Sequence, residues 1–140
     1  MDTPNALPDV RVTQVFNAPI EKVWRAISTS EGLGAWFMPN DFAPVVGHEF
    51  HIDAGPFGRQ RCIVKEIEPP SRIAFQWGTE WTITILLEDR GNDRTACTLV
   101  HAGWREDGMT EFNLPHAAVR ERMGQGWVGI VAKLGAVVEA

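Results

Sequence analysis

The 140-residue sequence contains no tyrosine, only two cysteines and fewer basic than acidic residues. Its 13 Lys and Arg against 18 Asp and Glu give a net charge of −5. This balance argues against nucleic-acid binding, which requires clustered basic residues. No apolar run is long enough to span a membrane, and the first residues lack the pattern of a secretion signal. These absences predict a cytoplasmic protein with no membrane span and no nucleic-acid partner.

Motifs for metal binding or catalysis are also scarce. Cys62 and Cys97 stand in separate strand-like segments, so two reduced, buried thiols are expected rather than a disulfide. His48 and His51 lie three residues apart on a predicted strand and face opposite sides, which disfavours a shared metal. No serine-nucleophile elbow, phosphate-binding loop or dinucleotide fingerprint occurs. The sequence therefore predicts no metal, no cofactor and no catalytic residue, and favours a protein that is not an enzyme.

Local patterns predict the order of helices and strands. A strand rich in β-branched residues at 10–16 is followed by a helix that begins at Pro19 and ends near Ile27. Ser28 and Glu31 have the spacing of a capping box, which predicts a second short helix to about Phe37. Alternation with period two then predicts strands at 48–53, 60–67, 72–77, 80–88 and 94–102.

The loops between these strands are too short for parallel crossovers, so the strands are expected to form an antiparallel meander with one apolar, aromatic face. The stretch 115–139 repeats apolar residues at helical spacing and would be about 37 Å long as one helix. Because that exceeds any strand, we expect it to lie across the sheet, although a start near Gly126 is an alternative. Its four glycines either allow close approach to the strands or leave volume for a ligand.

A series of short motifs runs through most of the chain in a fixed order. These are VFNAPIEKVW at 15–24, Trp36-Phe37-x-Pro39, Gly47-x-x-Phe50, EIEPPSRI at 66–73, Trp77, TITILLE at 82–88, Thr98-Leu99-x-His101-x-Gly103 and Gly126-Trp127. Together they resemble bacterial proteins similar to the activator of the Hsp90 ATPase (AHSA1-type). Those proteins belong to the START, polyketide-cyclase and Bet v 1-like superfamily (SRPBCC). The chain departs from the common pattern at His48, where a second glycine often follows Gly47, and 104–113 falls in a variable stretch.

The resemblance implies an α+β helix-grip fold. In that fold a curved antiparallel meander sheet of about six strands surrounds a long C-terminal helix, and two short helices follow the first strand. We expect one such domain over 1–140, with a core of about 9–138. The superfamily hosts lipid carriers, hormone receptors, aromatase/cyclases and co-chaperone domains, so the fold alone does not specify the function.

Three functions remain open. The favoured one is a carrier or sensor of a small hydrophobic molecule, such as a lipid, polyketide or aromatic metabolite, because the inward face is aromatic and the last helix is interrupted by glycines. The second is a cyclase- or hydrolase-like enzyme acting on a substrate bound in the cavity. The third, by family analogy alone, is a chaperone-associated stress-response protein that binds an Hsp90-type partner. An exposed edge strand also leaves a homodimer open.

His101 is the only polar side chain that we place inside the expected cavity, because it follows Leu99 by two residues and shares its inward face. It is either a buried histidine bonded to backbone or water, or a polar contact for a ligand or an acid–base group. A ligand-lining wall and a filled core have the same sequence pattern, so plain packing is the alternative for the whole set. The predicted lining residues are Trp36, Phe37, Phe50, Phe75, Trp77, Trp81, Ile83, Leu99, His101, Met123, Trp127, Ile130 and Leu134.

Overall fold

The computed structural model describes residues 7–55, 58–105, 108–109 and 114–140. Within these ranges the predicted element order is confirmed, with boundaries that shift by a few residues at most. The elements are β1 (Val10–Phe16), α1 (Ile20–Ile27), α2 (Ser30–Trp36), β2 (Glu49–Asp53), β3 (Arg59–Glu68), β4 (Arg72–Trp77), β5 (Trp81–Gly91), β6 (Arg94–Ala102) and α3 (His116–Glu139).

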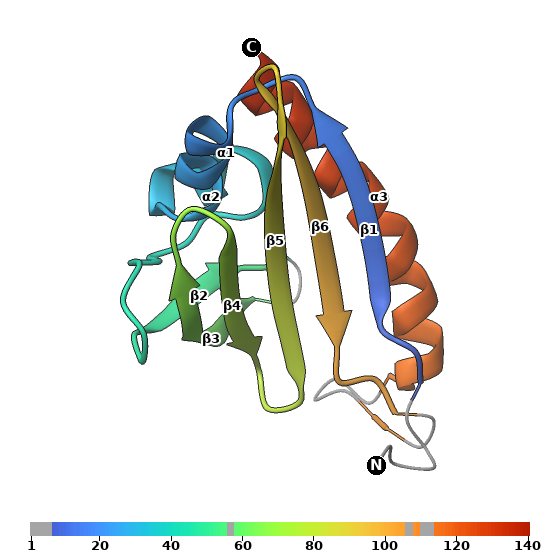
Figure 1. The fold of residues 1–140 in the computed structure, drawn as a ribbon. Coiled ribbons are helices and arrows are strands. Elements are labelled where there is room, and N and C mark those ends of the chain that lie inside the picture. The colour runs from blue at the N-terminus through green and yellow to red at the C-terminus, as the bar shows by residue number, and fades with distance from the viewer. Residues whose placement is uncertain (1–6, 56–57, 106–107, 110–113) are drawn as a thin grey trace.

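The strands form one antiparallel sheet in the order β1-β6-β5-β4-β3-β2. From β2 to β6, each strand pairs with the next in the sequence, as the short loops require, and β1 joins at the far edge beside β6. Figure 1 shows this curved sheet with α3 beside it and the two short helices at one end. The predicted α+β helix-grip fold is therefore confirmed.

Alternation along the strands sorts side chains between two faces of the sheet. Ile73, Phe75 and Trp77 of β4 are buried on the inner face, whereas Arg72 and Gln76 are only half-buried on the outer face. The same alternation continues through β5 and β6. Burial of the inner side chains stabilises the sheet, at about 1.5–3 kcal/mol for each large apolar residue.

The start of α2 differs from the predicted capping box. Thr29, not Ser28, is the N-cap residue, and its hydroxyl accepts a hydrogen bond from the backbone N–H of Gly32 at 2.9 Å. The Ser28 hydroxyl instead donates to the carbonyl of Trp24 at 2.6 Å. Serine and threonine are both good N-cap residues. The spacing to Glu31 favours Ser28, but the Ser28 hydroxyl is already bonded to the last turn of α1, so Thr29 caps α2. Pro19 likewise lies at the N-cap of α1 and not inside it.

Helix α3 is continuous from His116, so the alternative start near Gly126 is wrong. Its backbone lies nearest to the edge strand β1 and also packs against α1 and α2 (Figure 1), while Trp127 reaches over the inner face of the sheet to His101 of β6. Gly135 makes this possible, since a Cβ there would lie 2.9 Å from the Phe16 ring. Gly126 and Gly129 are exposed with nothing within 4 Å of a built Cβ, so they provide no ligand volume.

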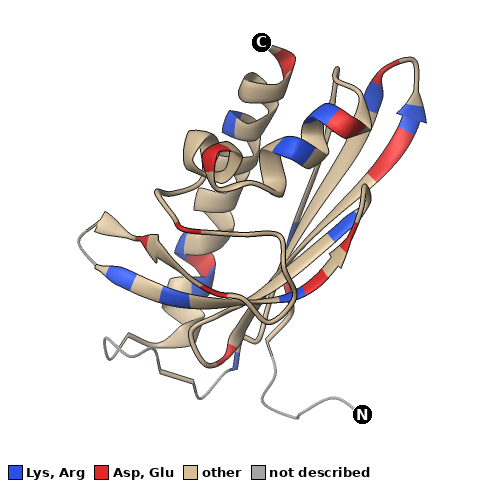
Figure 2. Ribbon diagram, turned by 90° about the vertical axis from the view of Figure 1, so that its left-hand side faces the viewer, with Lys and Arg blue, Asp and Glu red and all other residues tan. Residues whose placement is uncertain are grey.

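Charged residues of both signs lie on the outer surface of the molecule. Figure 2 shows basic and acidic segments interleaved along the strands and on α1. Within the ranges given above, none of the helices has the length and apolar character needed to cross a membrane.

Candidate functional site

Three neighbouring strands place aromatic rings side by side on the inner face. Trp77 of β4 and Trp81 of β5 are directly paired across the strands, with ring centroids 5.5 Å apart. His101 of β6 lies 4.9 Å from Trp81 and 5.9 Å from Trp77, stacked on the latter at 25°. Strand alternation produces this cluster, because all three residues fall on inward positions of adjacent strands.

Helices α2 and α3 complete the cluster from the other side. Trp127 of α3 stacks on Phe37, which follows α2, at 5.6 Å between ring centroids. The indole N–H of Trp127 donates to Nδ1 of His101 at 2.9 Å. Trp127 is buried in the middle of α3, so this hydrogen bond ties the helix to the sheet.

The protonation of His101 follows from this contact. Since Nδ1 accepts a hydrogen bond, the neutral ring carries its proton on Nε2. Burial, and to a smaller degree the charge of His116, lowers the pKa of His101 to about 3, so the ring is neutral near pH 7. A neutral ring whose Nδ1 is occupied offers a donor and no free acceptor. This geometry favours hydrogen bonding to a ligand over general-base catalysis.

Trp104 is a member of the cluster that sequence reasoning missed. Its ring lies 4.4 Å from that of His101, and its N–H donates to the His101 carbonyl at 3.0 Å. Trp104 follows β6 and Gly103, where neither strand alternation nor helical spacing applies. Trp104 is buried in the structure. In the sequence, the local signal that could have found it is a tryptophan close to His101.

Glu80, Arg105 and His116 form a polar cluster, which we call the clasp. It joins the residue before β5 and the segment after β6 to the start of α3. Nε2 of His116 lies 3.2 Å from Glu80, whose other oxygen is 2.7 Å from the Arg105 guanidinium. Nδ1 of His116 accepts the backbone N–H of Arg105 at 3.2 Å. His116 is buried, and both of its ring nitrogens have partners. Neither nitrogen is therefore free for chemistry.

Two glycines allow the clasp to close. Gly103 has a φ of 100°, and a Cβ there would lie 2.0 Å from the Glu80 carbonyl oxygen. Gly108 packs against the ring of His116, because a Cβ at this position would lie 2.4 Å from Nδ1 of His116. The sequence alone does not reveal the clasp because its members come from a turn, a loop and a helix start.

The aromatic interior is closed in this structure. The space between α2, the sheet and α3 is too narrow to admit a water molecule. Six predicted lining residues, together with Leu33 and Ile85, bound this interior space. The six are Trp36, Phe37, Phe75, Ile83, Leu99 and Trp127.

The other predicted lining residues lie around this space. Trp77, Trp81 and His101 form the cluster just described, while Phe50 and Leu134 are buried in the surrounding core. Met123 and Ile130 are only half-buried and pack on its edge. Most of the set is therefore packed in the core or bounds the interior space.

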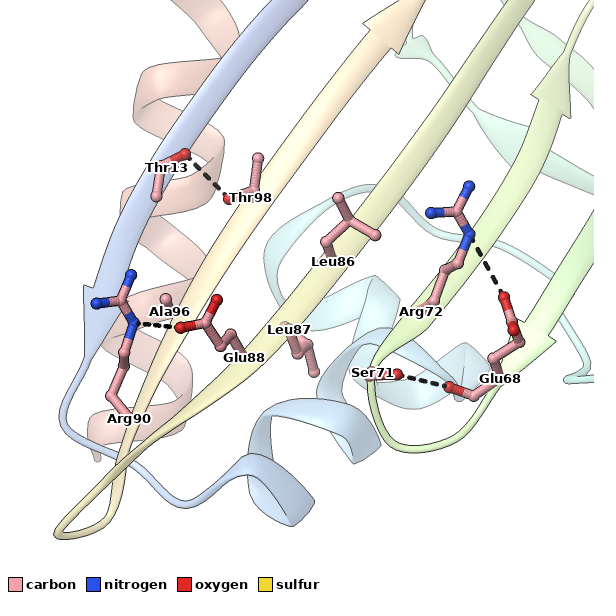
Figure 3. Close-up of a pocket in the computed structure, with 10 residues that line it drawn as sticks. All are labelled: Thr13, Glu68, Ser71, Arg72, Leu86, Leu87, Glu88, Arg90, Ala96 and Thr98. Carbon is pink, nitrogen blue, oxygen red and sulfur yellow. Dashed lines mark hydrogen bonds and ion pairs between the residues drawn. The ribbon is translucent and has the colours of Figure 1, made fainter.

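A larger hollow lies on the outer face of the sheet and is shown in Figure 3. It offers about 330 Å³ and is flanked by two ion pairs, Arg72 with Glu68 at 3.5 Å and Arg90 with Glu88 at 3.0 Å. These four side chains are at least 40% exposed, so each pair contributes at most about 1 kcal/mol. The lining is Thr13, Glu68, Ser71, Arg72, Leu86, Leu87, Glu88, Arg90, Ala96 and Thr98.

The remaining histidines and the cysteines lie outside the cluster. His51 is near Asp41 and Glu49 on β2, at 3.6 and 3.9 Å. Among the described residues, no three metal-ligating side chains gather. Cys62 and Cys97 are free and buried, and burial raises the pKa of each thiol to about 12, so neither is a reactive thiolate near pH 7.

Comparison with known families identifies the chain. Residues 17–139 match the family described as Activator of Hsp90 ATPase homolog 1-like protein. The chain belongs to this family. The resemblance drawn from the sequence motifs is thereby confirmed.

Solved structures of similar proteins share the fold of this AHSA1-family chain. Protein BH1534 of Bacillus halodurans is 44% identical, with 96% of this chain and 99% of that chain covered and a TM-score of 0.86. Protein MLL2253 of Mesorhizobium loti is 26% identical, covering 94% and 97%, with a TM-score of 0.83. The Aha1 dimer of Colwellia psychrerythraea is 20% identical, covering 95% and 97%, with a TM-score of 0.76. No curated protein matches the chain.

Proposed function

We propose that this AHSA1-family protein binds a small hydrophobic molecule between the sheet and α3, as a carrier or sensor. The observation that supports the proposal is the shared enclosure: side chains from α2, β4, β5, β6 and α3 converge on one apolar, aromatic space. A lining that is mostly apolar with few polar groups is typical of small-molecule sites.

Binding requires the interior to open, because the space in this structure is too narrow to admit a water molecule. The stacked pair Phe37 and Trp127 joins the end of α2 to the middle of α3. Separating these two rings would widen the space without breaking a strand pairing. The ligand-bound form would then be a minor conformation that the ligand stabilises.

Thermal unfolding against a panel of fatty acids, polyketides and aromatic metabolites tests this function. A specific ligand at a hundred times its Kd should stabilise the protein by about 2.7 kcal/mol, which raises Tm by several degrees. Native mass spectrometry of freshly purified protein should show a bound molecule. A panel without any stabilising compound, together with an empty protein by mass spectrometry, would contradict the proposal.

Trp127→Phe supplies a variant for the same assay. It keeps an aromatic ring at the α2–α3 contact but loses the N–H that bonds His101. We expect weaker stabilisation by the same ligand, because the variant changes a wall of the interior. Thr98→Ala, on the outer face, is the matched control and should leave the ligand effect unchanged.

Chaperone regulation is the second candidate, favoured by the family match alone. Stimulation of the ATPase rate of the cognate Hsp90 would support it, and an unchanged rate with no complex in a pull-down would exclude it.

The Colwellia neighbour is described as a dimer, and a homodimer of this chain is a related proposal that sedimentation analysis tests. The free thiols fit a reducing compartment, and we infer that the protein acts in the cytoplasm.

A further inference from the structure

Two neighbouring N–H groups in the interior have no partner. Nε2 of His101 and Nε1 of Trp81 are buried, and neither forms a hydrogen bond within the described part of the chain. The two rings are 4.9 Å apart and meet edge to face at 76°. A buried donor without a partner costs about 1–3 kcal/mol, so two of them in one cluster are a marked exception to normal protein interiors.

Among the described residues, the exception is confined to this pair. The indole N–H groups of the surrounding tryptophans all donate, Trp77 to Gln60, Trp104 to the His101 carbonyl and Trp127 to His101 Nδ1. Trp36 also donates, to the carbonyl of Ala26 at 2.8 Å. Each of these indoles is therefore satisfied, whereas the indole of Trp81, whose ring centroid lies 4.9 Å from that of His101, is not.

We propose that His101 Nε2–H and Trp81 Nε1–H bind an uncharged acceptor oxygen of the hydrophobic ligand, such as that of a ketone, ester or lactone. This rests on the proposed function and adds the polar chemistry of the ligand to it. Both protein groups are donors, so the ligand must supply the acceptor. An apolar body that carries one acceptor would satisfy the cluster where a plain hydrocarbon would leave both donors unpaired.

We expect the acceptor to be uncharged because, in the described part of the chain, the basic residues of the clasp beside this pair are already engaged. The His116 ring lies 6.0 Å from that of Trp81, and Arg105 and His116 are both paired with Glu80. A carboxylate buried beside His101 would lose its hydration without gaining an ion pair, which is strongly unfavourable. A fatty acid could therefore occupy the interior only with its carboxylate elsewhere.

Matched probes test the proposal. Fluorenone and fluorene have nearly the same shape and differ by a carbonyl oxygen, and fluorene-9-carboxylate carries a charge instead. We expect fluorenone to bind about tenfold more tightly than fluorene in calorimetric titration, from about 1.4 kcal/mol of hydrogen bonding. The carboxylate should bind more weakly than either.

The indole N–H signals in a nitrogen–proton correlation spectrum report the contact directly. Fluorenone should shift the Trp81 signal further downfield than fluorene does, while the signal of Trp24 on helix α1 serves as the reference because this residue lies outside the proposed site. A buried water that bridges the two donors in the free protein and persists when fluorenone is bound would overturn the proposal.

Trp81→Phe removes the donor and keeps an aromatic ring. The preference for fluorenone over fluorene should fall several-fold, whereas Trp24→Phe, the same change on helix α1 and outside the proposed site, should preserve the ratio. Equal binding of fluorenone and fluorene by the wild-type protein, with no Trp81 shift, would overturn the acceptor proposal and leave ligand binding intact. Failure of both probes and of the ligand panel would overturn the two together.

Discussion

The two faces of the sheet differ in how their polar atoms are satisfied. The outer hollow is open, and its arginines and glutamates pair with one another in contact with water (Figure 3). The inner cluster is aromatic, yet in the part of the chain that the structure describes two of its buried N–H groups lack hydrogen-bond partners. The charged groups of the outer hollow are paired or exposed to water, whereas the unmet hydrogen bonds are the reason why we propose the interior as the binding site.

His101→Ala should produce the largest effect on stability. The change empties part of the inner cluster and leaves the N–H of Trp127 without its acceptor, so we expect a loss of about 3 kcal/mol in the free energy of unfolding. Urea denaturation measures it. Thr98→Ala, on the opposite face of the same strand, should cost less than about 1 kcal/mol, and similar losses at both positions would contradict the contrast.

The pH dependence of stability should also originate on the inner face. The unfolded chain protonates His101 as pH falls through 6.5, whereas burial in the folded protein delays protonation until about pH 3. Stability should therefore be unaffected above pH 7 and fall by about 1.5 kcal/mol between pH 6.5 and 5. Urea titrations of the wild type and His101→Gln isolate this contribution, and parallel pH profiles would contradict it.

The glycines of α3 extend the comparison to the helix. Gly135→Ala places a methyl group 2.9 Å from Phe16, so overpacking should exceed the gain in helix propensity and destabilise by about 1 kcal/mol. Gly126→Ala meets nothing within 4 Å and should stabilise by up to about 1 kcal/mol. Opposite shifts of Tm are expected, and a shared sign would show that the two positions are equivalent.

The smallest effect is expected at the ion pairs. Glu80→Gln removes the charge that holds Arg105 and His116 and should destabilise by about 1 kcal/mol, with faster amide exchange in the first turn of α3. Glu88→Gln, in the outer hollow, should change stability by less than about 0.5 kcal/mol because Arg90 stays hydrated. Equal effects would mean that the clasp is no stronger than a surface pair.

Prediction from the sequence succeeded where the physical signal is local. Alternation placed Trp77 and His101 on inward positions, and both are buried there. It failed where two local signals compete, as for Ser28 and Thr29 at the start of α2, since either hydroxyl suits a cap. Helix α3 was predicted at nearly its full length, but the sequence left open a start near Gly126, because glycines within an apolar stripe are compatible with both a continuous helix and a shorter one.

The sequence by itself determined the element order, the antiparallel meander and the apolar character of the inner face. Strand period, loop length and residue type are local properties, and neighbouring residues are enough to express them. Only the tertiary structure decided that Trp104 joins His101, that Glu80 meets His116, and that His101 and Trp81 keep unpaired donors. Those facts depend on which side chains from distant segments share one dry space, and hydrogen-bond satisfaction is defined only there.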